Sequence, residues 1–297
     1  MTRPSHFPRG FAGISARDVH LSDGTRLRLV ESGDAKAPPV LLVHGFGASA
    51  YQWRFLFASL AEAGYHVLGP DLPGHGFSQL TFPDGEYTRE HFARRVMLLL
   101  DALQIERAPV IGHSMGGAIV AELAWRFPER VERLALMSAA GLGQVPWRAR
   151  LMTAIPDVLA PHAKPFVSRE AARLVLRDVY GPDATWTVRD EDELLAPYAQ
   201  AEIFRAMLRT LKEFDFTLHP AERLAQLPAG TLVLFGDADK VVRPADLDAR
   251  VAAIPGSRLV WLPRVGHLPH VEAAAQVGAL LTEFLRAPRV APAVEAH

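Results

Sequence analysis

A serine between two glycines is the strongest chemical signal in the sequence. Gly112-His-Ser-Met-Gly116 directly follows the apolar pair Val110-Ile111 and directly precedes a helical pattern over 115–127. A G-x-S-x-G motif between a buried strand and a helix is typical of a nucleophile elbow, a sharp turn that projects the serine hydroxyl into a cleft. The amino end of the helix also favours developing negative charge. Ser114 is therefore the candidate nucleophile.

An acidic loop and a histidine each follow a late apolar run. They are Gly236-Asp-Ala-Asp239 and Gly266-His267. A serine hydroxyl is a weak nucleophile, so it needs an imidazole to take its proton and a carboxylate to orient and stabilise that imidazole. The chain order Ser, Asp, His matches this arrangement. His267 is the candidate base, and Asp237 and Asp239 are both candidates for the acid. Asp71, at another strand end, is an outside candidate in what is better interpreted as a structural turn.

An early glycine-containing loop supplies the expected oxyanion hole. Val43-His-Gly-Phe-Gly47 ends an apolar run, and its glycines leave room for a substrate carbonyl to approach the backbone. In such a site the amide of the residue after the nucleophile, Met115, acts with an amide of the early loop, here Phe46. Both donors are backbone groups, so the two side chains are incidental. We expect His44 to brace the loop.

The other histidines near these motifs have no expected proton to move. We interpret His75, His113 and His270 as structural hydrogen-bonding groups. A zinc site made of His44, His75, His267 and His270 is conceivable on count alone, but no H-E-x-x-H or comparable ligand spacing occurs. The sequence predicts neither a metal nor a cofactor.

The elements that must position these residues follow an α/β rhythm. Residues 25–32 alternate apolar and polar, as a strand exposed on one face does, and continuous apolar runs then predict strands buried on both faces. Strands alternating with helices predict a doubly wound, mostly parallel sheet, whose functional groups gather at the carboxyl ends of the strands. The buried strands are expected around 40–43, 67–69, 110–111, 134–137, 232–235 and 259–262, and the helices at 50–63, 88–103, 115–127 and 271–286.

Residues 143–219 interrupt this rhythm. They contain several prolines and then mostly helical patterning, with no buried-strand signal before Thr231. We expect a helical cap at 143–219, inserted into a core of residues 1–142 and 220–297, with 288–297 as a flexible tail. We interpret the sequence of this predicted cap as apolar and aromatic, without clustered charge. Its aromatic residues, expected to line a substrate pocket or pack the cap itself, are Trp147, Phe166, Tyr180, Trp186, Tyr198, Phe204, Phe214 and Phe216.

The composition narrows the class of partner. The 297 residues are 49% hydrophobic and 22% charged, which is typical of a folded domain, and 32 Lys plus Arg stand against 33 Asp plus Glu. No global field favours nucleic acid or an anionic membrane. No apolar stretch predicts a signal peptide or membrane span, and there is no cysteine. We expect a cytoplasmic monomer or homodimer acting on a small molecule.

Taken together, the motifs resemble those of the α/β-hydrolase superfamily over nearly the whole chain. They are HGFG at 44–47, DLPGHGFS at 71–78, GHSMGG at 112–117, GDADKVV at 236–242 and GHLPHVE at 266–272. The resemblance implies a G-x-x-D acid after the penultimate core strand, which selects Asp239, and a histidine before the last helix, which is His267. The implied catalytic triad is Ser114, Asp239 and His267.

The resemblance also narrows the reaction. A serine at position 114 argues against the branches that use an aspartate nucleophile, the haloalkane dehalogenases and epoxide hydrolases. The remaining branches include carboxylesterases and the hydrolases that cleave carbon–carbon bonds of ring-fission products, although the latter usually carry an aromatic residue where this chain has Leu268. We expect an ester hydrolase that forms an acyl-enzyme on a small, mainly apolar substrate. Carbon–carbon or amide hydrolysis, acyl transfer, perhydrolysis and a non-catalytic ligand-binding protein on the same fold are the alternatives.

Overall fold

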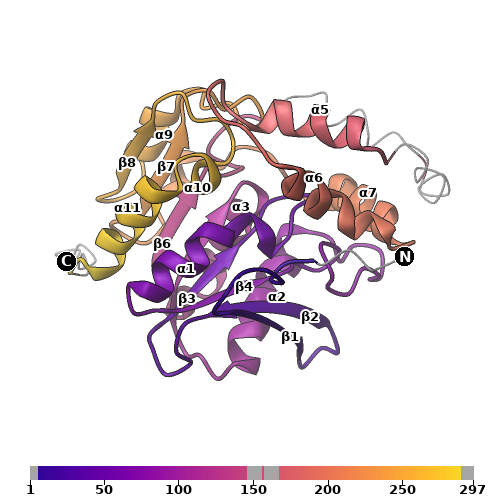
Figure 1. Cartoon of the computed structure of the whole chain (residues 1–297). Coiled ribbons are helices and arrows are strands. Elements are labelled where there is room, and N and C mark those ends of the chain that lie inside the picture. The colour runs from indigo at the N-terminus through magenta and orange to yellow at the C-terminus, as the bar shows by residue number, and fades with distance from the viewer. Residues whose placement is uncertain (1–5, 146–155, 157–166, 289–297) are drawn as a thin grey trace.

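The computed structural model describes residues 6–145, 156 and 167–288, and its centre is a twisted sheet flanked by helices (Figure 1). The described residues form an eight-stranded sheet in the order β1-β2-β4-β3-β5-β6-β7-β8. Every pair from β4 through β8 is parallel, whereas β2 pairs antiparallel with both β1 and β4. The predicted fold class, a mostly parallel doubly wound sheet, is confirmed.

The strands and helices have the following bounds. The strands are β1 (Ile14–His20), β2 (Arg26–Ser32), β3 (Pro39–Val43), β4 (His66–Pro70), β5 (Ala108–His113), β6 (Val131–Met137), β7 (Leu232–Gly236) and β8 (Arg258–Leu262). The helices are α1 (Arg54–Glu62), α2 (Arg89–Ala102), α3 (Met115–Arg126), α5 (Arg169–Val179), α6 (Val188–Leu195), α7 (Ile203–Glu213), α8 (Ala221–Leu224), α9 (Leu247–Ala252), α10 (Pro269–Glu272) and α11 (Ala274–Arg286), with short 3-10 helices η1 (Ala50–Trp53), η2 (Pro128–Arg130) and η5 (Ala196–Ala199).

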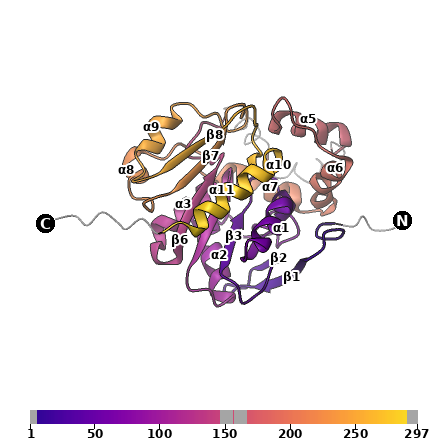
Figure 2. The ribbon, with the colours of Figure 1, turned by 60° about the vertical axis from the view of Figure 1, so that its left-hand side comes forward.

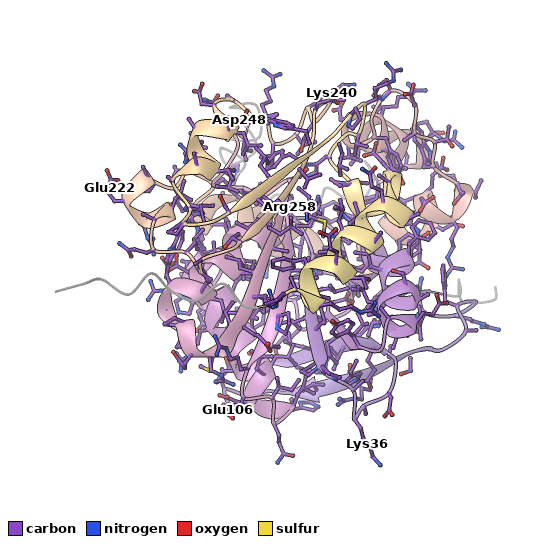
Figure 3. All side chains as sticks on the ribbon, turned by 90° about the vertical axis from the view of Figure 1, so that its left-hand side faces the viewer. Lys36, Glu106, Glu222, Lys240, Asp248 and Arg258 are labelled. Carbon is purple, nitrogen blue, oxygen red and sulfur yellow. The ribbon has the colours of Figure 1, made fainter. Side chains whose placement is uncertain are left out.

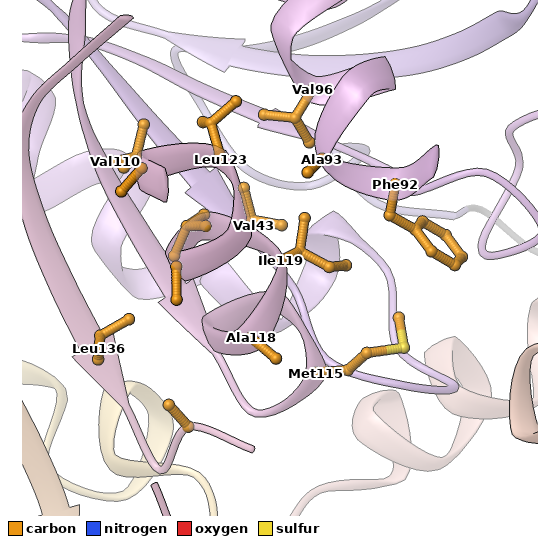
Figure 4. Packing of buried hydrophobic residues seen from close by; sticks show 14 of the residues in the cluster. Val43, Phe92, Ala93, Val96, Val110, Met115, Ala118, Ile119, Leu123 and Leu136 are labelled. Carbon is orange, nitrogen blue, oxygen red and sulfur yellow. The ribbon is translucent and has the colours of Figure 1, made fainter. Parts of the chain in front are cut away.

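Alternating side chains divide the buried strands between two hydrophobic cores. In β3, Leu41 and Val43 face the core beneath α2 and α3, and Val40 and Leu42 face the core beneath α1 and α11. Figure 4 shows the first core, where Ile119 of α3 lies beside Val43 of β3, and Phe92 of α2 belongs to the same cluster. Figure 2 shows α1 and α11 side by side over the other face. Burial on both faces explains the continuous apolar runs of these strands.

The structure adds two local features to the predicted elements. Strand β1 was not predicted, because it lies at the sheet edge and most of its side chains are exposed, so it has no apolar alternation. The single helix predicted at 271–286 is instead two, α10 and α11, because the backbone of Ala273 leaves the helical region at φ −123° and ψ 41°. Charged side chains such as Lys36 and Glu222 extend outward at the periphery (Figure 3).

Helices α5, α6 and α7 follow β6 and precede β7, within the range predicted for the cap. Figures 1 and 2 both place α5 and α6 together beyond the end of the central sheet. Trp147 and Phe166 lie outside the described residues, as do the tail residues 289–297. Of the other cap aromatics, Phe214 and Phe216 pack against the α2 and α3 core rather than within the cap. The cap boundaries stay a prediction.

Candidate active site

Ser114 occupies the turn between β5 and α3. Its backbone has φ 53° and ψ −120°, a conformation that is uncommon for a residue with a side chain. Its carbonyl oxygen accepts hydrogen bonds from the amides of Gly117 at 2.9 Å and Ala140 at 3.0 Å, which hold the turn. The side chain makes no capping bond to α3. The hydroxyl is thus free for another partner.

The two motif glycines are required by close packing around this turn. A Cβ atom at Gly116 would lie 2.2 Å from the carbonyl oxygen of Val43, and one at Gly112 would lie 2.5 Å from the carbonyl oxygen of Gly116. Real Cβ atoms do not approach backbone oxygens this closely, so neither position accepts a side chain without a shift of the backbone. The glycines therefore allow β3, β5 and α3 to meet beneath the serine.

A continuous chain of hydrogen bonds joins Ser114, His267 and Asp239. His267 Nε2 lies 2.9 Å from Ser114 Oγ, and His267 Nδ1 lies 2.8 Å from Asp239 Oδ2. All three residues are buried. They come from the turn after β5, the loop after β7 and the loop after β8, at the carboxyl ends of parallel strands. This is the geometry in which an imidazole can take a hydroxyl proton while a carboxylate orients it.

The two aspartates of the β7 loop have different partners. Asp239 Oδ1 accepts from the amides of Val241 and Val242, both at 2.9 Å, leaving Oδ2 for His267. Burial alone raises the pKa of the Asp239 carboxyl, but His267 and the Val242 amide outweigh it and hold the pKa below its ordinary value. Asp237 accepts instead from the Arg264 amide at 2.6 Å and braces the loop before His267.

The backbone of the β3 loop lies beside the nucleophile. A Cβ atom at Gly45 would come within 3.0 Å of Ser114 Cβ, so the loop passes close to the serine. Phe46 and Ser114 line the same pocket, and Met115 begins α3. Among the described residues, neither the Phe46 amide nor the Met115 amide donates a hydrogen bond to another protein group. Both are therefore available to a substrate oxygen.

His44 and Asp71 brace this loop from below. The Leu72 amide donates to His44 Nε2 at 2.8 Å, so the proton of the ring is on Nδ1, which donates to the Gly45 carbonyl oxygen at 2.8 Å. Burial lowers the pKa of His44 and keeps the ring neutral. The Asp71 carboxylate accepts from the amides of Ala50 and Phe77. Both side chains are committed to structural bonds and neither contacts Ser114.

Glu272, within the GHLPHVE motif, holds the loop of His267, a role that we did not assign from sequence. Its carboxylate accepts from the amides of Gly266 at 2.9 Å and Leu268 at 3.0 Å, on either side of the histidine. It also accepts from the amide of Gly181, two residues after α5, at 2.8 Å. The motif contained the signal, because a carboxylate shortly after a glycine-histidine turn can cap the amides of that turn.

His113 supports His267 from the other side. Its Nε2 lies 2.7 Å from the His267 carbonyl oxygen, which can only accept, so Nε2 is the donor. Burial and the neighbouring His267 lower the pKa of His113 to about 3. The ring contacts those of His267 and His270, with centroids 4.7 and 4.6 Å away and the ring planes tilted by 53° and 59°. Both His113 and His270 thus pack behind the site.

No zinc set forms from these histidines. Throughout the ranges that the structure describes, no group of three or more His, Cys, Asp or Glu side chains could hold a metal ion. His75 faces the carbonyl oxygen of Pro73 at 2.9 Å, and burial lowers its pKa to about 3.

A pocket of about 140 Å³ opens onto Ser114 and His267. One side of the pocket, within the range predicted for the cap, consists of apolar residues of α5 and α6, such as Leu176 and Leu194, together with Tyr180. The expectation of a cap without clustered charge was wrong, because α6 also brings the carboxylates of Asp190 and Glu193 to the pocket wall. Of the acidic residues on this helix, Asp190, Glu191 and Glu193 are buried, whereas the side chain of Asp192 is partly exposed.

Residues 38–274 match the family model described as the alpha/beta hydrolase fold. The chain belongs to the α/β-hydrolase family. This assigns it to the hydrolases as an enzyme class. Within the described ranges, none of the helices has the length and apolar character needed to cross a membrane.

Relatives and solved structures cover most of the chain and differ in their chemistry. The chain is 32% identical over 270 residues to the dihydrolipoyllysine-residue acetyltransferase component of the acetoin cleaving system of Pseudomonas putida, covering 89% of this chain and 67% of that protein. It is 31% identical to 2-hydroxymuconate semialdehyde hydrolase of Pseudomonas sp. strain CF600, covering 89% and 92%. A crystal structure of a membrane phospholipase A, described as a bacterial virulence factor, superposes with a TM-score of 0.76 at 28% identity over 93% and 87% of the two chains.

Proposed function

We propose that this protein is a serine-dependent carboxylic ester hydrolase in which Ser114, His267 and Asp239 form the catalytic triad. The observation that carries the proposal is the hydrogen-bonded chain from Ser114 Oγ through His267 to Asp239, with distances of 2.9 and 2.8 Å at the mouth of a small pocket. This arrangement suits attack on an acyl carbon, because it supplies a nucleophile, a base and an orienting carboxylate at once.

Acylation uses groups that are already in position. His267 Nε2 accepts the Ser114 proton as Oγ attacks the ester carbonyl carbon, and Asp239 stabilises the resulting imidazolium. The carbonyl oxygen becomes an oxyanion that accepts from the amides of Phe46 and Met115. When the tetrahedral intermediate collapses, the ester C–O bond breaks and His267 returns the proton to the departing alcohol.

Deacylation repeats these steps with water as the nucleophile. His267 takes a proton from the water as its oxygen attacks the acyl carbon, and the same two amides hold the second oxyanion. Collapse breaks the bond to Ser114 Oγ, which regains its proton from His267, and the carboxylic acid leaves.

The pocket supports a small acyl group. A dry protein cavity of about 150 Å³ accepts benzene, so a pocket of about 140 Å³ holds an acyl group of about that size. Apolar side chains such as Leu176, Val179 and Leu268 supply most of the contacts expected for its carbon chain.

Hydrolysis of p-nitrophenyl esters from acetate to decanoate tests the proposal. We expect kcat/KM to be highest for butanoate to hexanoate and to fall for decanoate, which exceeds the pocket. Ser114→Ala should lower kcat by at least about a thousandfold at equal folded concentration. Ser15→Ala, which changes an exposed serine on β1, is the matched control and should leave kcat unchanged. Equal activity of Ser114→Ala and the natural protein would refute Ser114 as the nucleophile.

Carbon–carbon bond hydrolysis is the second candidate, supported by the relative named 2-hydroxymuconate semialdehyde hydrolase, of which this chain covers 92%. Leu268 favours the ester, because carbon–carbon hydrolases usually carry an aromatic residue there. Measuring kcat/KM for a ring-fission dienoate beside butanoate esters separates the two. A higher kcat/KM for the dienoate than for the butanoate esters would favour carbon–carbon bond hydrolysis over the esterase proposal. Acyl transfer is tested in the same assay by adding an alcohol and analysing for a new ester.

The partner that we propose is a small-molecule substrate. The cytoplasmic location and the monomeric or homodimeric state stay predictions.

A further inference from the structure

One wall of the pocket contains a buried ion pair between core and cap. Arg54, the first residue of α1, places Nη2 2.7 Å from Oδ1 of Asp190 on α6, and their side chains are only 7% and 8% exposed. Both residues line the pocket that contains Ser114. Because burying two charges is costly, such a pair in a largely apolar pocket needs a reason.

The Asp190 carboxylate has little capacity left for a substrate. Its Oδ1 accepts from the Tyr51 hydroxyl at 2.9 Å as well as facing Arg54, and its Oδ2 accepts from the amide and hydroxyl of Thr187 at 2.8 and 2.7 Å. A carboxylate offers about four acceptor sites, so these partners occupy them. Asp190 is therefore a fixed counter-charge rather than a free acceptor.

Arg54, in contrast, has donors to spare. A guanidinium carries five N–H groups. Among the described residues its ion-pair partner is Asp190, and its Cζ lies 4.4 Å from the centroid of the Tyr51 ring and 4.5 Å from that of Phe55. The two cation–π contacts and the ion pair fix the group, so the remaining donors can meet a bound molecule with little loss of entropy.

The charges around Arg54 cancel. Glu193, which also lines the pocket, accepts from the Phe7 amide at 2.7 Å and pairs with Arg189 at 2.6 Å. The Arg54–Asp190 pair and the Arg189–Glu193 pair each sum to zero charge. A substrate that brings another net charge into this wall gains no counter-ion, whereas a neutral oxygen can accept from Arg54.

We propose that Arg54 is a substrate-binding residue that selects esters whose short acyl group carries a neutral oxygen acceptor, such as a ketone, ether or hydroxyl. This rests on the proposed ester hydrolysis and refines its substrate class. A wholly apolar acyl group would remove water from the free donors of Arg54 without replacing the lost hydrogen bonds. An oxygen acceptor on the acyl group replaces them. The rival explanation is that the pair only holds α6 onto the core, in which case removing it affects every ester equally.

Matched esters distinguish these explanations in the natural protein. We compare p-nitrophenyl 4-oxopentanoate, 4-methylpentanoate and hemisuccinate, which place a ketone oxygen, a methyl group and a carboxylate at the same position, and repeat the comparison with chains one carbon longer. A hydrogen bond from a charged donor supports about a tenfold to hundredfold preference in kcat/KM for the oxo ester over the methyl ester. We expect this at one of the two chain lengths, with the carboxylate ester the slowest. A ratio near one at both lengths overturns the proposal.

Arg54→Met then tests the assignment, because methionine keeps the stem and removes the donors. It should lower kcat/KM of the oxo ester about tenfold to hundredfold more than that of the methyl ester. Arg173→Met is the matched control. Arg173 of α5 pairs at 2.7 Å with Glu191, which lies on α6 like Asp190, but Arg173 does not line the pocket. This variant should keep the preference for the oxo ester. Equal losses of kcat/KM for both esters in Arg54→Met would show that the ion pair only holds α6 onto the core, and would overturn the proposal.

Failure of this proposal is distinguishable from failure of the proposed function. Ser114-dependent hydrolysis of the methyl ester with no oxo preference refutes only the role of Arg54. Absence of hydrolysis for every ester in the set refutes the esterase proposal and this inference together. Should Arg54→Met fail to fold, the ratio measured on the natural protein and on Arg54→Lys, which keeps the charge but loses the fork of donors, gives the decision.

Discussion

Replacing Glu272 with glutamine tests how the position of His267 is maintained. The Glu272 carboxylate accepts from three backbone amides, those of Gly266, Leu268 and Gly181, at 2.8 to 3.0 Å. In Glu272→Gln one oxygen becomes an NH2 group, which cannot accept, so one or two of the three bonds are lost and an amide is left facing a donor.

The magnitude follows from these bonds. A hydrogen bond to a charged group contributes about 1.5–3 kcal/mol, and because Glu272 is partly exposed we take the lower value, about 1.5 kcal/mol, for each bond lost. Loss of one or two bonds then lowers the free energy of unfolding by about 1.5–3 kcal/mol. This lowers Tm by about 3–12 °C, at about 2–4 °C per kcal/mol, and leaves the protein folded at 25 °C. Because the lost bonds flank His267, a displaced imidazole should lower kcat about tenfold to a hundredfold, with a smaller change in KM.

The assay combines thermal unfolding, followed by circular dichroism, with the kinetics of p-nitrophenyl butanoate hydrolysis. Glu283→Gln is the control, because the Glu283 side chain is 63% exposed and forms a surface ion pair with Arg258, so its loss should change stability by less than about 1 kcal/mol. If Glu272→Gln keeps both Tm and kcat, Glu272 does not hold the loop. If Tm falls and kcat does not, the loop keeps its catalytic geometry without it.

Two further predictions concern the carboxylates and the buried histidines. Asp239→Asn should lower kcat by about a thousandfold to ten-thousandfold while Asp237→Asn changes it only severalfold, because only Asp239 contacts His267; similar losses for both would contradict the assignment. His75 is fully buried and its pKa is lowered to about 3. Between its ordinary pKa of 6.5 and about pH 3, the unfolded chain therefore binds a proton at His75 that the folded protein does not. The free energy of unfolding thus decreases as the pH is lowered through this range. His75→Gln should therefore reduce the slope of the unfolding free energy against pH, from urea titrations between about pH 6 and pH 4, by about 1.4 kcal/mol per pH unit, and an unchanged slope would refute this.

Local patterns in the sequence were sufficient for the fold class and for choosing the candidate residues. A strand buried on both faces needs a continuous apolar run, and a nucleophile elbow needs small residues on both sides of its serine, so both leave a signal within a few neighbouring positions. The loop with Asp237 and Asp239 shows the limit. Both aspartates follow β7 within three residues, and from the residues alone either could serve as the acid.

Tertiary structure decided the relations between residues that are distant in sequence. Strand β1 left no apolar pattern because it is an exposed edge, and it is defined by pairing with β2. The pair of Arg54 and Asp190 could not be predicted, because an arginine at a helix start and an acidic helix are each ordinary surface features until α1 and α6 bury them together. Glu272 belongs to the GHLPHVE motif, yet its role depends on where the amides of Gly181 and Gly266 lie in the folded chain. Chemistry that depends on residue type can be predicted from sequence, whereas distances and burial arise only when the chain folds and brings these groups together.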